Sequence, residues 1–99
     1  MDSRIIKLSN MLTSYSCDLQ KGDRILIDYE GEAAKGLVCQ LIKDAYKLGA
    51  KPFVNHRDSR VLREILLGCD EEQIEFLNDY QLYQMKGMDA YIAIRVNEN

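Results

Sequence analysis

The sequence is poor in several residue types: it contains one histidine, one proline and no tryptophan in 99 residues. A single imidazole restricts the metal and acid–base sites that the chain could build, because catalytic metal centres usually combine several histidine and carboxylate ligands. No Gly/Ser/Pro-rich linker is present, so we expect a single domain over residues 1–99. The longest apolar run, residues 90–94, is far too short to cross a bilayer.

An excess of basic residues is also missing, since the formal net charge is −3. Nucleic-acid binding needs a concentrated basic face, so the composition argues against a nucleic-acid partner. The three cysteines, Cys17, Cys39 and Cys69, are odd in number and form no CxxC pair. We expect them to be buried free thiols in a reducing cytoplasm. The N-terminal stretch MDSRIIKLSNML lacks the unbroken apolar core of a signal peptide, which also favours a soluble cytoplasmic protein without a membrane partner.

Three short runs of apolar and β-branched residues alternate with helical patterns, and they predict strands near residues 24–29, 52–56 and 90–96. Each run is apolar enough to be covered on both sides, which favours a parallel sheet with helices on both faces. Right-handed crossovers leave few topologies, and we favour the order 2-1-3. The predicted fold class is α/β: a small three-layer domain with a three-stranded parallel sheet flanked by helices.

The first two helices are predicted from caps and from apolar residues at 3–4 spacing. The first begins at Asp2 or Ser3 and has the apolar face Ile5, Leu8, Leu12 and Tyr15. The second covers about residues 32–48 and has the apolar face Ala34, Leu37, Val38, Leu41, Ala45 and Leu48.

Two further helices lie between the second and third strands. Asp58 is placed to cap a helix that ends at Gly68, and Asp70 to cap the next one, with Gln73 completing a capping box. The apolar period of this last helix falters at residues 78–79, so we predict a break there.

The carboxyl ends of parallel strands meet along one edge of the sheet, where α/β proteins bind their ligands. The sequence places polar residues at all three ends: Glu30, Glu32, His56, Arg57, Asp58, Arg95, Asn97 and Glu98. One histidine among carboxylates could hold a divalent metal, but no ligand pair stands at i, i+3 or i, i+4 spacing and Asp58 is expected to cap a helix. We therefore predict no catalytic, cofactor or metal residue here, and keep a set of candidates for lining a cleft: Glu30, His56, Arg57, Asn97 and Glu98.

The stretch GEAAKG, residues 31–36, follows a strand and opens a helix, as a phosphate-binding loop would. A Walker loop needs Lys and Ser/Thr directly after its second glycine, where Leu37 and Val38 stand, and the spacing does not fit GxGxxG. Gly31 is better explained by the strand-to-helix turn. Cys39 is expected to be buried on the sheet-facing side of this helix and to be unreactive.

Several stretches together are similar to one enzyme family: LQKGDRILID, DAYKLGAKPFV, DEEQIEFLNDYQLYQMKGMDAYIAIR and the closing NEN. They resemble, in the same order and over essentially the whole chain, the N-terminal region of the M29 metallo-aminopeptidases of the aminopeptidase T and aminopeptidase S type. The resemblance implies a cytoplasmic, usually dimeric exopeptidase that removes N-terminal residues from peptides with a divalent metal pair (Zn, Co or Mn).

The family's chain is several times longer, and its metal ligands and catalytic residues lie in the C-terminal part. No position of this sequence matches them, so we assign no catalytic or metal residue here. The chain is then interpreted as an inactive N-terminal fragment whose partners are the C-terminal catalytic domain, a peptide substrate and possibly a second subunit. Two alternatives stay open: a stand-alone module that binds a small ligand, and a structural or oligomerisation domain.

Overall fold

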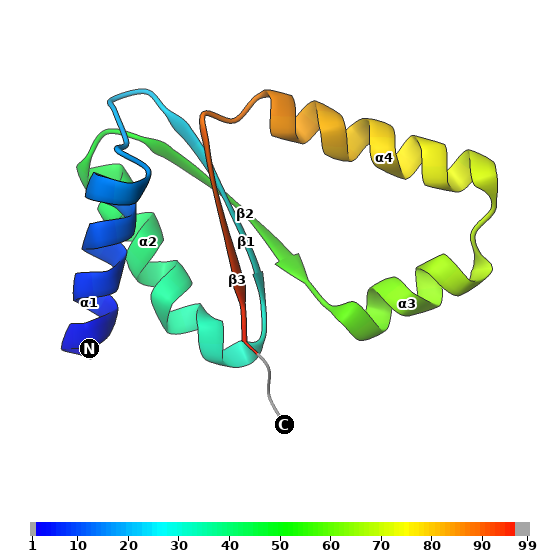
Figure 1. Cartoon of the computed structure of the whole chain (residues 1–99), viewed down its shortest axis with the longest axis horizontal. Helices are drawn as coiled ribbons and strands as arrows, with labels where there is room; N and C mark the ends of the chain where they lie inside the picture. Colours follow the sequence, from blue (N-terminus) through cyan, green and yellow to red (C-terminus); the bar gives the residue numbers. More distant parts are fainter. Residues whose placement is uncertain (1, 97–99) are drawn as a thin grey trace.

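The computed structural model describes residues 2–96. Its elements, in chain order, are α1 (Ser3–Asn10), a π-helical segment (Met11–Ser16), β1 (Arg24–Glu30), a 3₁₀ turn (Glu32–Ala34), α2 (Lys35–Lys47), β2 (Lys51–Arg57), α3 (Ser59–Gly68), α4 (Glu71–Lys86) and β3 (Ala90–Arg95). β1 is central and pairs in parallel with both neighbours, which gives the order β2-β1-β3 (Figure 1). The predicted fold class and strand order are confirmed, and each strand lies within a residue or two of its predicted bounds.

The hydrophobic core lies between the sheet and α2. Ile25 and Ile27 alternate along β1 and are fully buried, because every second residue of a strand points to the same face. Val38, Leu41 and Ala45 face them from α2 at 3–4 spacing. The apolar face predicted for this helix is therefore confirmed.

The face predicted for the first helix is partly wrong. Leu8 and Tyr15 are exposed, whereas Ser9 and Thr13 are buried. The Ser9 hydroxyl donates a hydrogen bond of 2.7 Å to the carboxylate of Asp44 on α2, and the Thr13 hydroxyl donates to the Ser9 carbonyl at 2.9 Å. A buried carboxylate needs such donors, so the contact between α1 and α2 is partly polar, which a hydrophobic pattern does not reveal.

The cysteines are less buried than predicted. Cys39 is exposed, and Cys17 and Cys69 are only partly covered. On α2, Val38 and Leu41 point toward the sheet, and a step of about 100° per residue turns Cys39 away from it. Burial raises the pKa of the Cys17 thiol.

The caps of α3 and α4 are confirmed, but the predicted break in α4 is wrong. The Asp58 carboxylate accepts from the backbone N–H of Arg60 and Val61, and that of Asp70 accepts from Gln73. α4 continues from Glu71 to Lys86 without interruption. Asn and Asp lower helix stability by only about 0.7 kcal/mol each relative to Ala, which a helix of 16 residues tolerates.

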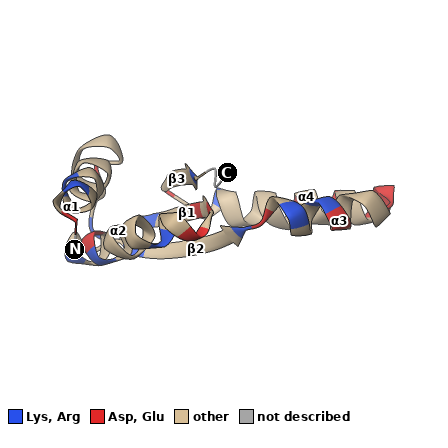
Figure 2. Cartoon of the chain, turned by 90° about the horizontal axis from the view of Figure 1, so that it is seen from below, with Lys and Arg blue, Asp and Glu red and all other residues tan. Residues whose placement is uncertain are grey.

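The two sides of the sheet are covered very differently. α2 packs against one side and α1 packs against α2, whereas α3 and α4 extend away from the other side (Figures 1 and 2). We call residues 59–86 the α3–α4 arm. The expectation that helices cover both faces is met in full on one side only: the arm flanks the sheet, and its two helices have no buried residue.

Candidate functional site

The parallel register brings the ends of the three strands to one edge, as predicted. Glu30 of β1 is in register with Arg57 of β2 and with Arg95 of β3. Side chains in register share a face of the sheet, so these three lie together on the side of the α3–α4 arm. Asn97 and Glu98, which were also predicted at this edge, lie outside the described residues.

A buried carboxylate that the sequence reasoning missed organises this edge. Asp28, in the middle of β1, is 2% exposed. Its Oδ2 accepts from Nε of Arg57 at 2.8 Å, and its Oδ1 lies 3.4 Å from Nη1 of Arg95. A buried charge is costly unless it is paired, and here one carboxylate ties both outer strands to the central one. The only signal in the sequence was an acidic residue directly after the apolar residues 25–27 of the predicted strand.

Glu30 and Asp58 accept hydrogen bonds from the first residues of α3. The Glu30 carboxylate accepts hydrogen bonds from both the backbone N–H and the hydroxyl of Ser59, which joins the end of β1 to the first residue of the helix. Asp58 is the N-cap of the same helix. Negative side chains at a helix N-terminus compensate its free N–H groups and its dipole. Both carboxylates therefore have a structural partner.

His56 lies on the opposite face from Arg57. Its ring stacks on Tyr29, with the ring centroids 4.7 Å apart. The carboxylate of Glu32 pairs with Lys35 at 2.9 Å, and this hydrogen bond holds the pKa of Glu32 below its usual value. The register thus separates His56 from the carboxylate of Glu30, although the sequence places both at strand ends.

The described polar side chains at this edge do not form the ligand set that a divalent metal needs. Within residues 2–96, no three His, Cys, Asp or Glu side chains gather closely enough to form a metal site. His56 is stacked on an aromatic ring, and Glu30 and Asp58 are hydrogen-bonded to α3. The described residues therefore do not fit a metal centre, and the absence of metal binding in solution stays a prediction.

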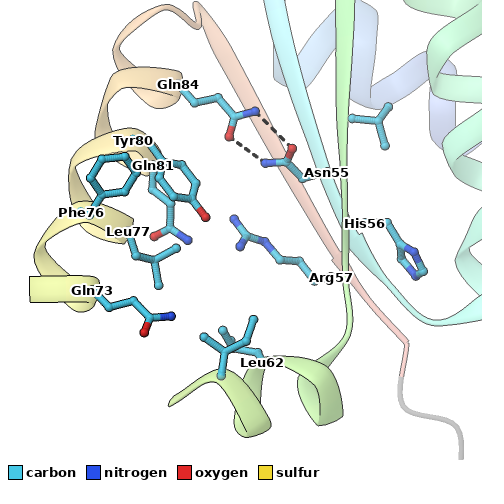
Figure 3. Close-up of a pocket in the computed structure, with 12 residues that line it drawn as sticks. Asn55, His56, Arg57, Leu62, Gln73, Phe76, Leu77, Tyr80, Gln81 and Gln84 are labelled. Atoms are coloured by element: carbon cyan, nitrogen blue, oxygen red, sulfur yellow. Dashed lines mark hydrogen bonds between the residues drawn. The ribbon is translucent and has the colours of Figure 1, made fainter. Parts of the chain in front are cut away.

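A groove of about 710 Å³ opens between β2 and the α3–α4 arm (Figure 3). Most of its apolar lining comes from the arm, with Val54 added from β2; the arm contributes Leu62, Ile65, Phe76, Leu77 and Tyr80. Arg57 points into it from the strand (Figure 3). Asn55 and Gln84 close one end of the groove by exchanging two side-chain hydrogen bonds, of 2.8 and 3.1 Å. This volume is within the usual range of ligand pockets, about 300–1,000 Å³, but the groove is only partly enclosed.

The charged side chains at this edge stabilise the structure by pairing with one another and with the start of α3. Asp28 is paired with two arginines, and Glu30 with a helix N-terminus. These contacts fix the strand ends and the root of the arm. The open groove beside them offers apolar surface, one guanidinium and several amides, which suits binding better than bond cleavage.

The fold places the chain in the α/β class of proteins. A parallel sheet of order 2-1-3 with helical crossovers is the arrangement with which a doubly wound α/β domain begins. Residues 1–99 match the sequence profile of a peptidase family that is described as thermophilic metalloprotease (M29). The chain therefore belongs to the M29 family, as its sequence stretches implied.

A solved structure supports the same assignment. Wild-type AmpT from Thermus thermophilus is 29% identical, with a TM-score of 0.53, over 69% of this chain and 17% of that one. The chain thus spans about a sixth of the length of AmpT. No curated protein sequence matches it significantly. In the described part of the chain, no helix is both long and apolar enough to cross a membrane.

Proposed function

We propose that these 99 residues form the N-terminal domain of a longer, cytoplasmic M29 aminopeptidase that releases N-terminal amino acids from peptides. The observation that carries the proposal is the M29 match over the whole chain, combined with coverage of only 17% of AmpT. In this account the domain supplies no metal ligand, and the divalent metal pair (Zn, Co or Mn) and the catalytic groups belong to the rest of the enzyme. The domain alone is inactive.

The role proposed for this domain is a supporting one, and contacts at the strand ends favour it. The Asp28 pairs and the contact between Glu30 and Ser59 hold the strand ends and the root of the α3–α4 arm in place. A fixed arm beside an open groove can shape the border of a neighbouring catalytic domain or of a second subunit. Such contacts would affect activity through the position of the domains rather than through the chemical step.

The experiment that tests this proposal is the intact mass of the native protein, read together with the open reading frame that encodes it. A product several times longer, which begins with these residues, is expected. A stable native product of 99 residues would overturn the proposal.

A second candidate function is favoured by one observation, the exposed apolar groove. A stand-alone module that binds a small ligand or a partner could use that surface. A native 99-residue product that binds a ligand in the groove would favour this second function.

A further inference from the structure

The α3–α4 arm exposes apolar side chains that helices normally bury. On α3, Val61, Leu62, Ile65 and Leu66 follow one another at helical spacing and form one face, yet they are 38–57% exposed. An amphipathic helix of this kind is stabilised mainly by packing its apolar face. Within the described residues, that face has no broad contact with the sheet.

α4 shows the same feature on more than one side. Phe76, Tyr80 and Tyr83 follow one another at helical spacing on one side of the helix and are 54–83% exposed, and the rings of Phe76 and Tyr80 contact each other edge to face with their centroids 5.9 Å apart. On other sides of the helix, Ile74 and Leu82 are 40% and 54% exposed. Aromatic side chains of this size are usually buried or at interfaces, because each carries a large apolar area. Apolar residues on several sides of one helix indicate that it is covered from more than one direction.

The arm is nevertheless held in a defined position. At its start, Ser59 donates to Glu30, and near its end Gln84 is hydrogen-bonded to Asn55. Beyond its end, the carboxylate of Asp89 accepts from the backbone N–H of Arg24 at 2.8 Å. The arm is therefore anchored to the sheet at both ends. Between these two anchors, the groove separates the arm from β2 (Figure 3).

This exposure is concentrated on the arm side of the sheet. On the other side, α2 buries Val38, Leu41 and Ala45 against β1. Parallel sheets almost always have both faces covered, and a contiguous apolar surface of this kind marks an interaction site.

We infer that the α3–α4 arm and its groove are the docking surface for the remaining chain of the M29 enzyme, which lays an apolar-faced segment against Phe76, Tyr80 and the apolar face of α3. The occupant is identified by length: this chain spans 17% of AmpT, so most of such a protein is available to cover the surface. The inference rests on the proposed function, because it requires that a longer chain exists. A second copy of the 99-residue chain is the alternative occupant.

The test compares two single-cysteine replacements of similar exposure. Phe76→Cys lies on the arm, where Phe76 is 70% exposed, and Tyr46→Cys lies on α2, where Tyr46 is 64% exposed. Each is made in the 99-residue chain and in the full reading frame. Labelling by a maleimide is followed by mass spectrometry of the separate peptides, so that the native thiols do not interfere.

In the 99-residue chain, both introduced thiols should label quickly and independently of protein concentration. In the full-length protein, labelling of Phe76→Cys should slow by about tenfold or more, because burial raises thiol pKa and blocks access. Labelling of Tyr46→Cys should change little. If circular dichroism shows that Phe76→Cys does not fold, Tyr83→Cys replaces it, since Tyr83 is 83% exposed on the same helix.

Equal labelling of Phe76→Cys in the short and long proteins would overturn the inference. Slow labelling in the short chain that speeds up on dilution would also overturn it, in favour of a second copy. The outcome is separable from the proposed function: an active full-length enzyme without protection of the arm removes only this inference, whereas protection in an inactive full-length protein removes only the aminopeptidase activity.

Discussion

Replacing Leu41 by alanine should remove a large part of the stability of the 99-residue chain. Leu41 is fully buried, in the cluster between α2 and β1. Deleting such a side chain costs about 2–5 kcal/mol, because the packing contacts are lost and a cavity remains. A domain of this size has a total stability of about 5–15 kcal/mol. A loss of about 3 kcal/mol would lower Tm by roughly 12–24 °C.

The matched control is Leu67→Ala. It deletes the same atoms from a leucine that is 70% exposed on α3, so it should change the free energy of unfolding by no more than about 0.5 kcal/mol. Both variants are measured by urea unfolding, followed by far-UV circular dichroism. A cost at Leu67 as large as the cost at Leu41 would show that the arm is packed in the isolated chain, and would refute the account of a one-sided core.

Three further predictions concern single positions. Gly31→Ala should destabilise the chain more than Gly22→Ala: both glycines have positive φ, but only at Gly31 would a Cβ lie 2.9 Å from a backbone oxygen, and equal unfolding free energies would contradict this. In native buffer near neutral pH, Cys39 should react with a thiol reagent faster than Cys17, whose pKa is raised by burial; the reverse order would place Cys39 inside. Calorimetry with Zn²⁺, Co²⁺ or Mn²⁺ should detect no tight site, and stoichiometric binding that His56→Ala abolishes would disprove the structural role given to that histidine.

The sheet was predictable because its signals are local. β-branched runs, glycines at the turns and a helical face at 3–4 spacing each specify one element, and the right-handed crossover rule then orders the strands. Leu41 and Ala45 could be assigned to the core from spacing alone. The caps at Asp58 and Asp70 were equally local, since one side chain serves N–H groups two or three residues away.

The edge was only half predictable, because its pairing depends on register. Glu30, Arg57 and Arg95 were placed at one edge from strand polarity. The pairing of Asp28 with both arginines depends on the register of the three strands. This register could not be derived from the sequence. Ser9 was missed for a related reason: its partner Asp44 is 35 residues away, and neither residue is apolar.

The α3–α4 arm was misjudged because its apolar residues do not face the single core between α2 and β1. The uneven apolar pattern of α4 suggested a break, whereas the helix is continuous. A pattern read against a single core falters when a helix has apolar residues on several sides. The exposure of Phe76 and Tyr83 is the observation on which the proposed docking surface rests.

The proposed function is tested most directly by comparing peptide hydrolysis by the 99-residue chain and by the full-length protein. The measurement is turnover of a chromogenic aminoacyl amide by the 99-residue chain and by the full reading frame, each with added Co²⁺ or Zn²⁺ and each after treatment with a chelator. Metal-assisted hydrolysis needs several ligands, a water and a general base held together, and the described residues do not gather such a set. The full-length protein should therefore turn over the substrate and lose activity to the chelator, while the short chain stays inactive. Turnover by the 99-residue chain, or an inactive full-length protein, would contradict the account.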